Sequence, residues 1–306
     1  MSNKIILGSR GSKLSIAYAN KVLSLLSNIK PALDKEVILK TIKTSGDLFD
    51  KKKISEIGGK NLFCKEIEDK LISKEIDIAV HSLKDLDSVE TDGLVIQAYL
   101  KRNDPRDTLV SSKFKKLSEL NGQKIGSSSR RRELQLKQLN RNIKVESIRG
   151  NIDTRIKKIE NGEYDGAILA LAGLKVLNLE KYAKEIFSLK DFLPTAGQGI
   201  VAVQCRVQDD NIKKILKEIN HKETETCALA ERSFLKTLGG DCDTAVGCTA
   251  ILNKKDIELK AQLFSDDGTK VFNITKTGKE NEPEVLGKLA GEEILKQSGK
   301  NFIKKR

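Results

Sequence analysis

Arginine is concentrated in one short stretch of this 306-residue chain. Half of its 12 arginines lie between residues 126 and 155, namely Arg130, Arg131, Arg132, Arg141, Arg149 and Arg155. Three of them follow "GSSS" where a helix should begin, although the positive start of a helix disfavours further cations. Because a guanidinium grips a carboxylate or phosphate with two donors, the cluster indicates a polyanionic ligand. The alternative is a solvated run of charge.

The stretch "IDIAVHSLKDLD", residues 76–87, begins with an apolar run and ends in polar side chains. The stretch predicts a strand whose carboxyl end carries His81, Lys84 and Asp85, and such ends line the ligand crevice of open α/β sheets. Asp85 is therefore a candidate for stabilising a positive reaction centre. An ordinary surface pair with Lys84 is the alternative. His81 could serve as a general base, but a single histidine at a strand end is more often structural, and we expect the structural role.

Cys242 lies in the glycine-rich turn "GGDCDTAVGC", between an expected helix and an expected strand. A thiol in such a turn is accessible, which favours a reactive or covalent role. The other cysteines singled out by the pattern, Cys64, Cys205 and Cys248, are expected to pack as small core residues.

Two segments rich in glycine and serine each connect an expected strand to an expected helix. They are "GSRGS" at residues 8–12 and "GSSSR" at residues 126–130. Glycine lets the backbone approach a ligand, and the serine hydroxyls and helix-start N–H groups donate to anions. Serine is also a plain helix N-cap, so each segment alone is weak evidence.

Strand-like runs alternate with helical periodicity over the first two-thirds of the chain, which predicts an α/β fold with mostly parallel sheets. After about residue 220 a long helix, three strands and a last helix predict a small α+β unit. We therefore predict three domains. Their ranges are 1–101 with 199–219, 102–198, and 220–306.

The chain is basic, with 56 lysines and arginines against 43 acidic residues. This charge suits nucleic acid or an acidic small molecule, but aromatics are only 4% and no helix-turn-helix, finger or RNP pattern is present. Five cysteines without CxxC spacing and two histidines argue against a metal site and for a reducing compartment. Without a signal peptide or an apolar run of membrane-spanning length, we expect a cytoplasmic protein that binds no membrane.

Nine motifs occur together in one order between Gly8 and Gly247. They are "GSRGSKLS", "GGKNLFCKEIE", "DIAVHSLKDL", "DPRDTLV", "IGSSSRRREL", "IRGNIDTR", "NGEYDGAILALAGL", "TAGQGIVAVQCR" and "GGDCDTAVG". In this combination the chain resembles the porphobilinogen deaminase family, also called hydroxymethylbilane synthase. The resemblance implies three domains, of which the first two are similar to the bilobal type II periplasmic binding proteins.

The resemblance also implies the activity. Members of the family are transferases of porphyrin and heme biosynthesis that join four porphobilinogen molecules head to tail and release ammonia each time. The chain grows on a dipyrromethane cofactor held by a thioether to one cysteine, and hydrolysis releases linear hydroxymethylbilane. The acetate and propionate groups of this chain would be the polyanion. We expect a monomer whose product passes to uroporphyrinogen-III synthase.

Matching the motifs residue by residue assigns roles that the resemblance implies. Asp85 is the catalytic carboxylate and Cys242 carries the cofactor. The remaining cofactor-binding positions are Lys84, Ser129, Arg131 and Arg132. The substrate-binding positions are Arg10, Ser12, Ser127, Ser128, Arg149 and Arg155. No metal is expected.

The chain departs from the family pattern at a few positions. Asp87 replaces a proline, Asp241 and Ala245 flank the cysteine, and Val176 stands where some members have an arginine that Lys175 could replace. Two other classes stay open: a bilobal solute-binding protein, which would need no Asp85 or Cys242 chemistry, and a nucleic-acid-binding protein.

Overall fold

The computed structural model describes residues 4–29, 36–45, 64–239, 244–265 and 267–299. The chain divides into two compact units. The first comprises Met1–Asn103 and Ile200–Glu225, and the second comprises Asp104–Gly199 and Thr226–Arg306. Each unit is therefore built from two separate stretches of the chain.

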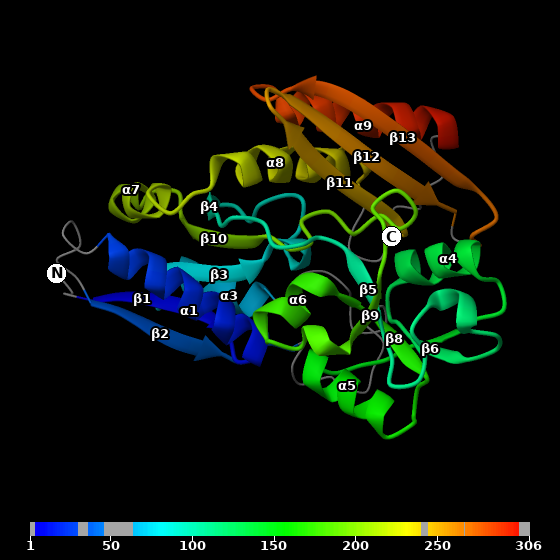
Figure 1. The fold of residues 1–306 in the computed structure, drawn as a ribbon. Coiled ribbons are helices and arrows are strands. Elements are labelled where there is room, and N and C mark those ends of the chain that lie inside the picture. Colours follow the sequence, from blue (N-terminus) through cyan, green and yellow to red (C-terminus); the bar gives the residue numbers. More distant parts are fainter. Residues whose placement is uncertain (1–3, 30–35, 46–63, 240–243, 266, 300–306) are drawn as a thin grey trace. The chain divides into compact units, whose positions relative to one another are not determined.

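The first unit contains a five-stranded sheet in the order β2-β1-β3-β10-β4 (Figure 1). Its strands are β1 (Lys4–Arg10), β2 (Glu36–Ile42), β3 (Ile78–Ser82), β4 (Leu94–Tyr99) and β10 (Val201–Arg206). Strand β1 is parallel to β2 and β3, whereas β10 is antiparallel to both of its neighbours. The helices of this unit include α1 (Lys13–Asn28), α3 (Lys65–Ile72) and α7 (Asp210–Lys217).

The second unit repeats this plan in the order β7-β6-β8-β5-β9. Its strands are β5 (Asp107–Val110), β6 (Lys124–Gly126), β7 (Lys144–Glu146), β8 (Gly166–Ala170) and β9 (Ala183–Ile186). Again one strand, β5, runs against the other four. Its helices include α4 (Arg130–Leu139), α5 (Ile152–Glu160) and α6 (Leu171–Val176). In both sheets the antiparallel strand is the first strand after the chain crosses from one unit to the other.

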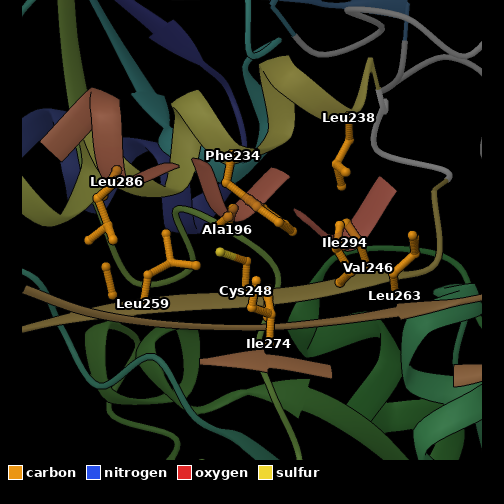
Figure 2. Packing of buried hydrophobic residues seen from close by; sticks show 14 of the residues in the cluster. Ala196, Phe234, Leu238, Val246, Cys248, Leu259, Leu263, Ile274, Leu286 and Ile294 are labelled. Atoms are coloured by element: carbon orange, nitrogen blue, oxygen red, sulfur yellow. The ribbon is translucent and has the colours of Figure 1, made fainter. Parts of the chain in front are cut away.

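The C-terminal part of the second unit is a three-stranded antiparallel sheet with two helices. Its elements are α8 (Lys222–Leu238) from Thr226 onward, β11 (Val246–Asn253), β12 (Asp256–Phe264), β13 (Val271–Lys279) and α9 (Pro283–Ser298). Figure 2 shows side chains of both helices, such as Phe234 and Leu286, meeting strand residues such as Leu259. The helices approach closely because α9 has Gly287 at the contact, where a Cβ would clash with the Ala230 carbonyl.

The predicted fold class is confirmed: two mostly parallel α/β sheets are followed by a small α+β part. The compact units do not separate residues 226–306 from 104–199, and the three-domain division stays a prediction. Within the described ranges, no helix has the length and apolar character needed to cross a membrane.

Candidate functional site

Asp85 sits on a short turn that the end of β3 fixes in place. The buried strand leads into a 3-10 turn, Leu83–Asp85. Leu83 is 2% exposed and its N–H donates to the Ile200 carbonyl at 3.0 Å. Lys84 and Asp85 on the same turn are only half-buried. One apolar anchor thus leaves a cation and a carboxylate accessible at the carboxyl end of the strand.

Three groups lie near the Asp85 turn. The Cys64 thiol donates to the Asp85 carbonyl oxygen at 3.3 Å. Burial and then the Asp85 charge raise the pKa of Tyr18 to about 12. The same two causes, in that order, raise the pKa of Cys64, and the Arg10 charge opposes them. Asp85 therefore lies among protonated side chains.

Arg10 and Ser12 lie at the junction of β1 and α1. Since β1 pairs in parallel with β3, Leu7 opposite Ile78, their carboxyl ends reach the same edge of the sheet. Ser12 caps α1, because its hydroxyl accepts the Ser15 N–H at 3.2 Å. Arg10 is half-buried. The structure therefore brings Arg10, Ser12, Lys84 and Asp85 to one edge of the first sheet.

His81 belongs to the core of this sheet. It is 5% exposed, and burial lowers its pKa to about 4, although a hydrogen bond with Gln204 opposes this. A neutral, buried imidazole supports the structural interpretation.

In the second unit, the three serines before α4 hold their own loop. Ser127 is buried, and its backbone N–H donates to the Glu146 carbonyl at 2.8 Å. The Ser128 hydroxyl donates to the Ile148 carbonyl at 2.8 Å. Ser129 is the N-cap of α4. These bonds fix the loop from which the arginine helix starts.

The first arginines of α4 have separate destinations. Arg130 pairs with Glu133 on the surface at 2.7 Å. Arg131 and Arg132 turn inward, and their Nη2 atoms lie 2.9 and 2.7 Å from the two carboxylate oxygens of Asp107. Asp107 is completely buried. Arg131 and Arg132 are thus not solvated charge.

The arginines keep Asp107 ionised. Burial alone would raise the pKa of this carboxyl, but the charges of Arg132 and Arg131 outweigh it and lower the pKa to about 2. Burial also lowers the pKa of Arg131 to about 10, and the Asp107 charge opposes this. Gln198 adds a hydrogen bond to Asp107 at 2.9 Å.

Arg149 and Arg155 remain partly exposed. Arg149 follows the buried Ile148, and Arg155 lies in the second turn of α5. The Arg155 Nε–H donates to the Gly150 carbonyl at 2.8 Å, which folds this side chain back toward the loop before the helix. Both guanidinia can therefore reach a ligand from solvent.

Cys242 and Asp241 lie outside the described residues. The segment just after them is held against α4: Ala245 is 6% exposed and packs with Leu134 of α4 and Phe264 of β12. The four cysteines that the structure describes, Cys64, Cys205, Cys227 and Cys248, are all buried.

Lys175 was expected to replace the arginine that some family members have at position 176, but in the structure it pairs with a carboxylate of the protein itself. Its Nζ lies 3.3 Å from Asp104, which Arg106 also binds at 2.7 Å. The pattern also did not single out Asp107 and Gln198 as site residues. The sequence signal that could have found Asp107 is the motif "DPRDTLV", in which it stands. Among the described residues, no group of three or more His, Cys, Asp or Glu could hold a metal ion.

Known protein families and individual relatives match this chain over nearly its whole length. Residues 5–214 match the family described as "Porphobilinogen deaminase, dipyromethane cofactor binding domain", and residues 225–296 match "Porphobilinogen deaminase, C-terminal domain". The porphobilinogen deaminase of Nitrobacter hamburgensis is 38% identical over 97% of this chain and 94% of its own. That of Brevibacillus brevis is 41% identical over 97% and 96%.

Among solved structures, the periplasmic VFT2 domain of Bordetella pertussis BvgS is 13% identical, covering 71% of this chain and 86% of that one. Its TM-score is 0.44, which is too low to support any conclusion.

Proposed function

Because the chain belongs to the porphobilinogen deaminase family, we propose that Asp85 and the arginines after residue 126 carry out the family's reaction in it. The activity is that of hydroxymethylbilane synthase in tetrapyrrole biosynthesis, with a dipyrromethane cofactor. Four porphobilinogen molecules are joined with loss of ammonia, and the product is the linear tetrapyrrole. The alternatives of a solute-binding and a nucleic-acid-binding protein therefore do not hold.

Asp85 stabilises the positive charge that develops when ammonia leaves the substrate. The observation that carries this proposal is a half-buried carboxylate at a strand end, on a turn fixed by the buried Leu83. A fixed carboxylate in a partly dry site stabilises a developing cation more than water does, because it does not have to reorient. It can also accept and return the pyrrole protons.

The partly exposed cations bind the carboxylates of the growing chain. Arg149 and Arg155, with Ser127 and Ser128 nearby in sequence, are proposed to bind acetate and propionate groups from the second unit. Arg10 and Ser12 are proposed to bind such groups as well. Arginine suits this role because its planar fork matches a carboxylate.

Arg131 and Arg132, with Ser129 and Lys84, are proposed to bind the cofactor. The residues present fit its carboxylates, since the Nε–H groups of both arginines are buried and have no acceptor among the described residues. When bound, the dipyrromethane supplies the pyrrole end from which the product chain is extended.

We further propose that Cys242 forms the thioether. The other four cysteines are buried, and Cys248 is 0% exposed within β11. An intact mass higher than the sequence mass by one dipyrromethane, mapped to a peptide containing Cys242, is the expected result. An active preparation of unmodified mass, or the adduct on Cys248, would refute the assignment.

The remaining proposals concern the surroundings of the enzyme. We propose a cytoplasmic monomer that hands its product to uroporphyrinogen-III synthase. An odd number of cysteines without CxxC spacing suits a reducing compartment.

The decisive experiment is Asp85→Asn, which keeps the shape of the side chain and removes its charge. Turnover of porphobilinogen should fall about 10²-fold or more while the fold is retained. Asp87→Asn, two residues along the same loop, is the matched control and should stay within a few-fold of the parent. Near-normal turnover of Asp85→Asn would show that the carboxylate is not catalytic.

A further inference from the structure

The ion cluster at the start of α4 is not balanced in charge. Arg131 and Arg132 are 4% and 8% exposed, and Asp107 is 0% exposed. Among the described residues, the salt bridges of both arginines go to this one carboxylate. Two cations and one anion leave the buried cluster with one positive charge in excess. A buried charge is costly unless a partner neutralises it, so the cluster favours a bound anion.

Asp107 determines how the two guanidinia are oriented. Consecutive helix residues point about 100° apart, yet both side chains converge on this carboxylate, one on each oxygen. Gln198 holds the carboxylate from its own side, since its Nε2 donates to Oδ1 at 2.9 Å and to the Pro105 carbonyl at 2.7 Å.

The outer donors of the guanidinia are used within the fold as well. The Nη1 atom of Arg131 donates to the Leu193 carbonyl at 2.6 Å, and that of Arg132 donates to the Ile168 carbonyl at 3.0 Å. Of the donors of these two guanidinia, only the Nε–H groups are buried without an acceptor in the described part of the chain. Two donors and one excess charge are the requirements of a single carboxylate.

We propose that Asp107 is a positioning residue that holds Arg131 and Arg132 with their Nε–H groups free for one carboxylate of the dipyrromethane cofactor. Its single charge neutralises one arginine and leaves the other for the ligand. A second buried acid would cancel the attraction, and no acid would leave the guanidinia without a common anchor. The inference rests on the cofactor-binding role proposed above for the two arginines.

Intact-mass measurement of the purified protein tests the inference, because it reports the share of molecules that carry the cofactor independently of activity. Asp107→Asn should lower this share about tenfold, the effect of losing a charge-assisted hydrogen bond. Asp104→Asn is the matched control: it lies three residues before Asp107, in the segment that leads into β5, and pairs with Arg106, which is 40% exposed. It should load fully.

A purely structural role would lower the melting temperature of Asp107→Asn and leave loading of the folded molecules unchanged. That outcome would overturn the inference. If Asp107→Asn does not fold, Gln198→Leu replaces it, because this variant removes the support of the carboxylate without changing any charge. Partial loss of loading in folded Gln198→Leu supports the inference, and full loading overturns it.

Arg132→Lys separates this inference from the proposed function. Lysine keeps the charge beside Asp107 and loses the planar fork. If Arg132→Lys loads fully, the arginine does not bind the cofactor, and both proposals fail. If Arg132→Lys loads poorly while Asp107→Asn loads fully, the cofactor role of the arginine stands and the positioning role of Asp107 fails.

Discussion

Lowering the pH from 7 to 3 should remove part of the stability that the Asp107 charge gives to the fold. The pKa of this carboxyl lies at about 2 in the folded protein, against 3.8 as its ordinary value. This difference corresponds to about 2 kcal/mol of folding free energy at neutral pH.

The sign follows from proton binding. The folded pKa is depressed, so the unfolded chain binds a proton at Asp107 at higher pH than the folded chain does. The stabilisation is therefore complete above about pH 5 and is lost as the pH falls through 3.8 toward 2. By pH 3 about 1 kcal/mol of it should be gone.

Urea unfolding followed by circular dichroism, at pH 7, 5 and 3, measures this loss. The free-energy difference between the parent and Asp107→Asn should shrink by about 1 kcal/mol from pH 7 to pH 3. Other acid-sensitive groups, such as buried His81, titrate in both proteins and cancel in the difference. Asp92→Asn, at an exposed position, is the control and should show no such trend. A difference independent of pH would refute the view that Asp107 is ionised by its arginines.

Two further predictions use matched variants. Arg149→Lys should lower kcat/KM for porphobilinogen about tenfold, because the bidentate fork of the guanidinium is lost. Arg141→Lys, at an exposed position, should change kcat/KM by no more than about twofold. Equal effects of the two variants would indicate diffuse charge instead of a shaped site. Cys64→Ala should lower kcat about three-fold or more because the Asp85 carbonyl loses a donor, and Cys64→Ser should restore kcat. Steady-state kinetics at a temperature where both variants are folded measures this. Equal kcat values in the two variants would show that the thiol only fills space.

The alternating pattern of the chain predicted most of the elements, because their apolar periodicity is strong. The strands β1, β2, β3 and β4 follow apolar runs, and α4 starts at Arg130 as expected from "GSSS". Strands β5 and β9 were missed. Strand β5 carries Asp107 and Thr108 in a fully buried position, and β9 alternates in exposure at the sheet edge, so neither has an apolar run. Partners distant in sequence make these strands, and local periodicity does not reveal such partners.

In the candidate site, too, the sequence predicted some features and not others. Asp85 and Lys84 were predicted from a strand end, and the resemblance assigned Arg10 and Ser12. The parallel pairing of β1 with β3 explains why all four reach one edge. The burial of Arg131 and Arg132 was not predicted. Their types and spacing indicate an anion, but only the fold shows that the first anion they contact belongs to the protein itself.

Three arginines at the start of a helix are unfavourable in isolation, because the free N–H groups of the first turn are already positive. The structure resolves this by giving the charges different surroundings. Arg130 is balanced on the surface by Glu133, and Arg131 and Arg132 share one carboxylate in the interior. What remains is one positive charge and two N–H donors beside the positive end of α4, held by a framework of backbone carbonyls and Gln198. Since these groups are oriented before any ligand arrives, an anion bound there would lose little free energy to reorganisation. The unfavourable helix start and the anion site are therefore the same feature, and Asp107 is the residue that makes it compatible with folding.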